Sequence, residues 1–301
     1  MQNFSLWPTS SLFDKYWHTK SHLAFGLTEH CNYFATLAII FTSIFSGLFI
    51  YNEKKDDLIT YIILSIIGCF AALFTYTRIA MIGIFSTIFG FLLLIILLKI
   101  FYKNKISIKQ TLKKLLILSI CFLLCFIIVE IFTGSIKKEV SISVSEINKV
   151  QTQNKIESFG SNRGTIWKVG LNSLKKYPLT GVGFDNYRYS FKIYPKDFNW
   201  SQNKGHNEYI HIFVTQGILS GINYLIFTFW CCLFPLIKIL KGESEFSKSN
   251  LTKIFLIAIF AYFVQSLFNS SVTNVAPYKW ILMGLLLPRF EQKNLLNFKK
   301  K

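Results

Sequence analysis

The stretch that decides the fold is residues 79–98, IAMIGIFSTIFGFLLLIILL, which contains no charged residue. Its length matches the ~20 predominantly apolar residues that a helix needs to cross a ~30 Å hydrocarbon core. Six further apolar runs, the last of them shorter, lie at Tyr33–Tyr51, Leu58–Thr77, Leu115–Thr133, Ile218–Leu240, Leu251–Ser271 and Trp280–Leu287. The sequence therefore predicts an all-α integral membrane protein with about seven transmembrane helices, the seventh starting upstream of its apolar run.

Composition favours the same fold class. Of the 301 residues, 52% are hydrophobic and 17% are aromatic, yet the formal net charge is +18. A soluble domain would carry that combination with difficulty, whereas a membrane protein places the apolar runs in lipid and the basic residues in loops. The cysteines lie inside or beside the apolar runs without CxxC spacing, so they indicate neither a disulfide framework nor a metal site.

Basic residues predict the orientation, because short cytoplasmic loops collect Lys and Arg. They gather at 99–114, at 238–253 and at 289–301, which alternate threading places on one side, the cytoplasm. The N-terminal stretch to Asn32, the Thr77/Arg78 turn, residues 134–205 and residues 271–279 are then expected to face outward. The start carries no export signal, so we expect either that upstream helices are missing from this chain or that the orientation of the first run differs.

The long outward segment, 134–205, divides into two parts. Residues 137–158 are polar without a core-forming pattern, which predicts a flexible or surface-draped segment. From Ser161 the apolar residues have helical spacing, which predicts a short amphipathic helix on the membrane, capped by Ser161 or Asn162 and ending before Pro178. Arg163 at the start of this helix is either part of a phosphate site or a surface arginine near a cap.

Three other polar residues on this outer face have more than one interpretation. Arg78 interrupts two apolar runs and needs water or an anion as its partner. Arg188 lies among aromatic residues, which is typical of a side chain that snorkels to the headgroups. His206 would share a helix face with Ile210, Phe213 and Gly217 but not with His211, so no two-histidine metal site is predicted.

Two segments together resemble a known family. RGTIWKVGLNSLKKYPLTGVGFDNY at 163–187, followed by HNEYIHIFVTQGILSG at 206–221, is similar to the signature region of the O-antigen ligase and polymerase superfamily. Upstream, FGLTEHCNYFATLAII resembles the family's segment with Asn at a helix start, and TYTRIAMIGIF resembles its Ser-Arg-Gly turn, with Thr77 and Ile79 in place of Ser and Gly. The chain is also shorter than typical members.

The resemblance implies a GT-C-like membrane glycosyltransferase that uses a polyprenyl-diphosphate-linked glycan as donor, in the bacterial inner membrane with its active face outward. It implies that Arg78 and Arg163 bind the diphosphate and that His206 acts at the acceptor hydroxyl. Arg188, Asn207 and Asn32 are further expected substrate-binding residues. The reaction would invert the anomeric carbon and require neither metal nor other cofactor.

The resemblance also implies an organisation and a set of partners. We expect transmembrane helices over 1–133, an external catalytic loop over 134–205, and further transmembrane helices with a basic tail over 206–301. The expected partners are the donor, a lipid-anchored, glycan or protein acceptor, and membrane lipids, but no nucleic acid. The sequence does not separate a ligase from a repeat-unit polymerase, and a polytopic transporter or an inactive remnant are the alternatives from other classes.

Overall fold

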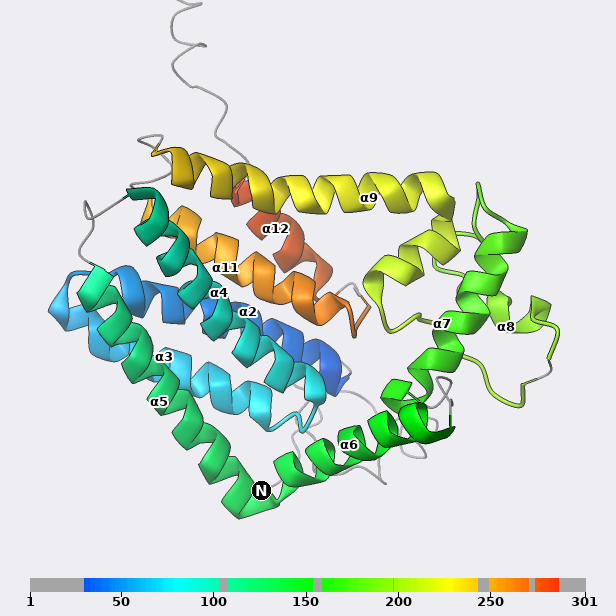
Figure 1. Cartoon of the computed structure of the whole chain (residues 1–301), viewed down its shortest axis with the longest axis horizontal. Helices are drawn as coiled ribbons and strands as arrows, with labels where there is room; N and C mark the ends of the chain where they lie inside the picture. Colours follow the sequence, from blue (N-terminus) through cyan, green and yellow to red (C-terminus); the bar gives the residue numbers. More distant parts are fainter. Residues whose placement is uncertain are drawn as a thin grey trace, which may run out of the picture.

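The computed structural model describes residues 30–102, 108–153, 159–196, 198–242, 249–270 and 274–286. The regular secondary structure in these ranges is helical throughout (Figure 1). The predicted outward N-terminal stretch, except for its last residues, and the basic C-terminal tail lie outside the described residues.

The apolar runs form a bundle of helices. Five helices are long and apolar enough to cross a membrane, namely α2 (Cys31–Tyr51), α3 (Lys55–Leu73), α4 (Arg78–Tyr102), α5 (Ile108–Thr133) and α9 (Glu208–Lys241). Two apolar helices complete the bundle but are shorter, with 17 residues in α11 (Asn250–Ser266) and 11 in α12 (Ala276–Leu286). The all-helical membrane fold is thus confirmed, and the total of seven spans stays a prediction.

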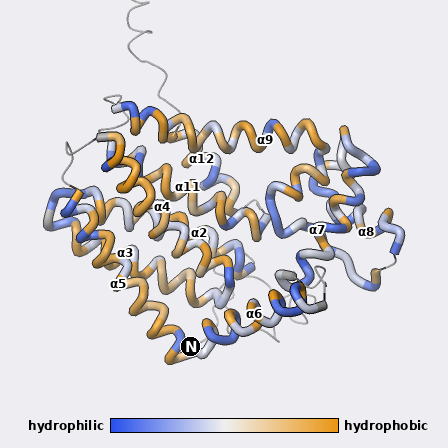
Figure 2. The backbone as a smooth tube through the Cα atoms, viewed as in Figure 1, coloured by the Kyte–Doolittle hydropathy of each residue, from blue (hydrophilic) through white to orange (hydrophobic). Residues whose placement is uncertain are grey.

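Small residues on α2, α3 and α4 let the helices of the bundle approach closely. A Cβ atom on Gly47 of α2 would lie 2.6 Å from the Ile254 side chain of α11. Between α2 and α4, Ser43 and Thr87 form a buried hydrogen bond of 2.7 Å. Close backbone approach and interhelical hydrogen bonds are typical of membrane helices, where hydrophobic burial alone cannot drive association. The outward faces of α3 and α5 remain apolar (Figure 2), as expected of a surface in contact with lipid.

The segment predicted to be flexible or surface-draped, residues 137–158, is helical over its described part, residues 137–153. The helix α6 (Ser135–Gln153) leaves the end of α5 and leads to α7 (Phe159–Lys176) (Figure 1). Its carboxylates Glu139 and Glu146 are seven residues apart, two helical turns, and both contact Arg78 of α4. The alternative of a flexible segment was wrong, because tertiary contacts stabilise this polar helix and local composition does not reveal them.

The helix α9 is broken at Gly217, whose backbone adopts φ 85° and ψ 175°. The break leaves carbonyl groups that would accept hydrogen bonds within a continuous helix, and N–H groups of the segment after α7 donate to them instead. Val182 N–H donates to Val214 O at 2.9 Å, and Gly183 N–H donates to Thr215 O at 3.1 Å. The short part of α9 before Gly217 is therefore hydrogen-bonded to the segment that follows α7, and the rest of α9 continues along the bundle (Figure 1).

Candidate active site

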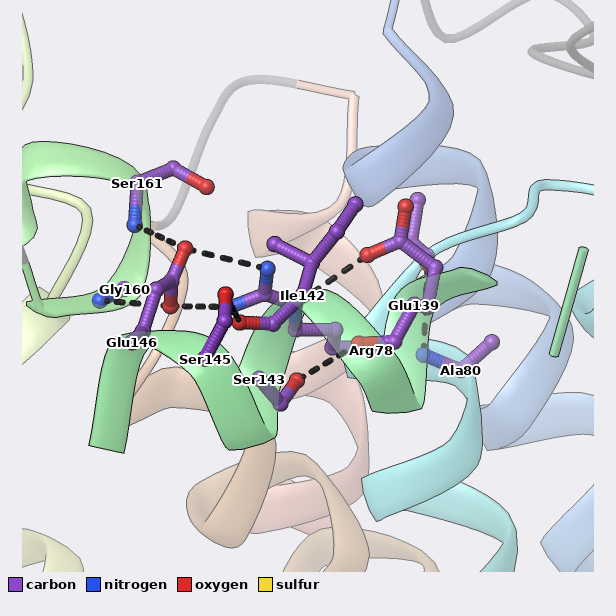
Figure 3. Close-up of polar contacts among 10 residues, drawn as sticks. Arg78, Ala80, Glu139, Ile142, Ser143, Ser145, Glu146, Gly160 and Ser161 are labelled. Atoms are coloured by element: carbon purple, nitrogen blue, oxygen red, sulfur yellow. Dashed lines mark hydrogen bonds and ion pairs between the residues drawn. The ribbon is translucent and has the colours of Figure 1, made fainter. Parts of the chain in front are cut away.

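Arg78 begins α4 and is surrounded by two carboxylates from α6 (Figure 3). Its Nη1 and Nη2 donate to the two oxygens of Glu146 at 2.7 and 3.2 Å, and its Nε donates to Glu139 at 3.1 Å. A bidentate arginine–carboxylate pair is among the stronger ion pairs in proteins. The charge of Arg78 is thus compensated from within the fold, by two residues that the sequence reading did not select.

The same Glu146 carboxylate also binds the turn that opens α7. Gly160, Ser161 and Asn162 all have positive φ, at 62°, 59° and 68°, so the helix proper starts at Arg163. The N–H groups of Gly160 and Ser161 donate to the two Glu146 oxygens at 3.1 and 3.3 Å (Figure 3). Burial acts to raise the pKa of Glu146, but these bonds and the Arg78 charge hold the pKa below its usual value.

Arg163 follows this turn and has a different environment from Arg78. In the part of the chain that the structure describes, no ion pair to Arg163 is found. Burial lowers the pKa of its guanidinium and the nearby charge of Arg78 lowers it further, while the charge of Glu146 acts in the opposite direction. A half-buried arginine beside a second cation is favourably placed to bind an anion.

His206 lies just before α9, not on it. Its φ is 48°, and Asn207 is the N-cap of the helix, so the expected common face of His206 with Ile210, Phe213 and Gly217 is not formed. Burial lowers the pKa of His206 to about 4, helped by the charges of Arg163, His30 and His211. The imidazole is therefore neutral at neutral pH and lies within electrostatic range of Arg163.

The remaining predicted site residues have partners within the fold. Asn207 accepts a hydrogen bond from Ile210 N–H and donates to Leu267 O, both at 2.9 Å. Asn32 is the second residue of α2, and its backbone carbonyl accepts from the Asn269 side chain at 3.3 Å. Arg188 is exposed before the short helix α8 (Tyr189–Ile193), where its Nε donates to Ser201 Oγ at 3.0 Å. Electrostatic interactions connect Arg163 with both Arg78 and His206, and Asn207 is the chain neighbour of His206.

An apolar cavity of about 550 Å³ lies between α4, α9 and α11. It reaches from Asn207, the neighbour of His206, to Leu97 and Leu236 near the other ends of α4 and α9. Its lining is apolar along most of this length, with leucine, isoleucine and phenylalanine side chains from all three helices. The cavity is thus shaped for a long hydrocarbon chain whose head would lie beside His206.

The start of α9 is held in place by a buried ion pair between Glu208 and Lys279. The carboxylate of Glu208 accepts hydrogen bonds from Lys279 of α12, from Tyr224 and, at 2.7 Å, from Tyr262 of α11. The Glu208 and Lys279 side chains are only 3% and 2% exposed. Sequence reasoning missed this pair because Glu208 and Lys279 lie outside the apolar runs and 71 residues apart.

Comparison with known proteins identifies the family to which the chain belongs. No group of three or more metal-ligating side chains occurs within the ranges described. A search of curated proteins finds no match. A family model described as O-antigen ligase matches residues 62–225, more than half of the chain, and this range contains Arg78, Arg163 and His206. The chain therefore belongs to the O-antigen ligase family, whose members carry out glycosyl transfer of the ligase or polymerase type.

Proposed function

We propose that this protein transfers a glycan from a polyprenyl-diphosphate carrier to an acceptor hydroxyl at the outer face of the bacterial inner membrane. The observation that carries the proposal is the apolar cavity that ends at Asn207, next to the neutral His206 and near the cationic Arg163. This combination suits a ligand with a long apolar chain, an anionic head and a hydroxyl nucleophile beside it. Residues 134–205 and His206 would supply the catalytic loop, on a GT-C-like scaffold.

The arginines would act on the leaving group. As the anomeric bond breaks, negative charge grows on the diphosphate oxygens, and a preorganised cation stabilises that charge more than it stabilises the ground state. Arg163 is suited to this role because no ion pair in the described part of the chain compensates its charge. Arg78 would join it once the donor phosphates replace Glu146 on its guanidinium.

His206 would act as general base on the acceptor. A neutral imidazole can take the hydroxyl proton as the oxygen attacks the anomeric carbon, typically contributing roughly 10²- to 10⁴-fold to the rate. The positive charge of Arg163 is one cause of the low pKa of His206. A diphosphate bound at Arg163 offsets that charge, so donor binding would make His206 a stronger base. Backside attack would invert the anomeric configuration, and the step requires no metal.

The test uses the purified chain in liposomes with polyprenyl-diphosphate-linked glycan extracted from the native membranes. Release of polyprenyl diphosphate with movement of the glycan to a new anchor would indicate a ligase. Longer glycans that remain on the polyprenyl carrier would indicate a polymerase. Movement of intact donor across the bilayer, without cleavage of the anomeric bond, would contradict the proposal and favour transport.

A further inference from the structure

The residue before His206, Gly205, is held by side chains on both sides of its backbone. Its N–H donates to Nδ1 of His211 at 3.3 Å, and its carbonyl accepts from Trp167 Nε1 at 2.9 Å. Gly205 is buried, and a Cβ atom there would lie 2.9 Å from the ring of Tyr187. The peptide that leads into His206 is therefore fixed by α7, by α9 and by the loop between them.

His211 is itself fixed in orientation and in tautomer. Its Nδ1 must be unprotonated to accept from Gly205, so Nε2 carries the proton and donates to Asp185 at 3.1 Å. The Tyr187 ring stacks on the imidazole at 5.5 Å and 11°. With both nitrogens engaged, His211 has no free lone pair with which to take a proton from an acceptor.

Asp185 completes this arrangement on the solvent side. Burial acts to raise its pKa, but the hydrogen bond and charge of Lys204, then the contact with His211, hold the pKa below its usual value. Asp185 is therefore ionised at neutral pH and keeps accepting from Nε2 of His211. A carboxylate that orients an imidazole through one nitrogen sets what the other nitrogen can do.

His206 requires such support because its backbone is left-handed, with φ 48°. That conformation is unfavourable for a non-glycine residue, which holds it only where the surroundings impose it. The two bonds to Gly205 supply this constraint directly beside His206. We propose that His211, through the hydrogen bond that its Nδ1 accepts from Gly205, is a positioning residue that holds His206 in line with the acceptor hydroxyl, an inference that rests on the proposed role of His206 as general base.

Two substitutions separate the two contacts of His211. In His211→Asn the amide oxygen can take the place of Nδ1 and still accept from Gly205, but the side chain no longer reaches Asp185. In His211→Gln the amide reaches the position of Nε2 near Asp185, but no acceptor remains for Gly205. Both variants replace the imidazole by a side-chain amide, so each serves as the control for the other.

We expect His211→Gln to lower kcat by about 10- to 100-fold with the KM for donor unchanged, and His211→Asn to stay within about threefold of the parent. The substrate is the extracted polyprenyl-diphosphate-linked glycan, and the readout is released polyprenyl diphosphate. Equal kcat values for the two variants, or a normal kcat in His211→Gln, would overturn the inference. Lys192→Gln, at an exposed lysine of α8, is the control substitution.

Thermal unfolding in detergent checks that both His211 variants fold. If they do not, Trp167→Phe decides the matter, because it removes the bond to the Gly205 carbonyl and keeps an aromatic ring against the Tyr187 cluster. A lower kcat with unchanged KM then supports the inference, and an unchanged kcat overturns it. His206→Ala distinguishes the two proposals: near-normal transfer in that variant removes the general-base role itself, whereas inactivity beside a fully active His211→Gln removes only the positioning role.

Discussion

Two ion pairs anchor the two sides of the candidate site, and they differ in exposure. The Arg78 and Glu146 side chains, which fix the turn before Arg163, are 21% and 11% exposed. The Lys279 and Glu208 side chains, which fix the start of α9 beside His206, are 2% and 3% exposed. Both pairs join distant parts of the chain, and each lies close to one proposed functional residue.

The difference decides which pair can be exchanged for a ligand. A partly exposed carboxylate released from Arg78 can be solvated, and a phosphate can take its place at the guanidinium. A carboxylate released from Lys279 would remain in the protein interior without compensation, which is strongly unfavourable. The Arg78 pair is therefore suited to give way to an anionic substrate, and the Glu208 pair to hold its geometry permanently.

The largest effect should come from breaking the buried pair. Lys279→Met leaves Glu208 without its cation and should lower the free energy of unfolding by about 3–5 kcal/mol. The double variant Glu208→Gln/Lys279→Met should recover most of this loss, because it leaves no isolated charge. Chemical unfolding in detergent measures both, and a single variant as stable as the parent would show that the pair is not the anchor described here.

Arg163 should be the arginine with the largest effect on catalysis. Arg163→Ala should lower kcat/KM by about 10²- to 10³-fold, the loss typical of removing one group that stabilises transition-state charge. Arg163→Lys should recover little, because a point charge cannot replace a planar fork that binds two phosphate oxygens. Full activity of the lysine variant in the glycan-transfer assay would leave Arg163 with a structural role only.

The pH dependence should report the environment of His206. Protonation abolishes its ability to act as a base, so activity should fall as pH drops through its pKa of about 4 and not near the ordinary value of 6.5. This limb should appear in kcat/KM, and the limb in kcat should lie at higher pH, because the bound diphosphate offsets the charge of Arg163. An acid limb near 6.5 in kcat/KM would contradict the assigned environment.

The Arg78–Glu146 pair, the less buried of the two, should behave in the opposite way from the Lys279–Glu208 pair. Glu146→Gln should strengthen binding of inorganic pyrophosphate by roughly 3- to 10-fold, because the competing carboxylate charge is gone. It should cost about 1–3 kcal/mol of stability, because the buried Glu146 loses a charge-assisted bond to Arg78. Calorimetric titration at low salt measures the affinity, with Glu139→Gln as the matched control at the single-contact carboxylate. Weaker pyrophosphate binding would mean that Glu146 positions Arg78 and does not compete for it.

The smallest effect is expected at Arg188. Its side chain is exposed and bonded to Ser201, so Arg188→Ala should change kcat/KM by no more than about 2-fold. A loss comparable to that of Arg163→Ala would place Arg188 in the substrate site, as the sequence first suggested.

Much of the fold could be predicted because the bilayer imposes a simple rule. A run such as residues 79–98 must be helical in lipid, since its backbone groups find no other partners there. The predicted runs accordingly correspond to helices of the bundle, although α11 and α12 are too short to count as spans on length alone. The helix α6 escaped prediction because its sequence is polar, and its ion pairs with Arg78 connect residues more than 60 positions apart.

The candidate site, like the fold, could be predicted only in part from the sequence. The motifs around Arg78, Arg163 and His206 were recognisable in the sequence, because the spacing of residues within a segment is local information. Three further features were not recognisable in the sequence. Glu146 forms an ion pair with Arg78, Arg163 forms no ion pair with the rest of the described chain, and His211 accepts a hydrogen bond from Gly205. The sequence by itself determined a helical membrane protein of this family. Only the tertiary structure decided which charges are compensated and how His206 is held, because ion pairs and hydrogen bonds between distant segments depend on how the helices pack.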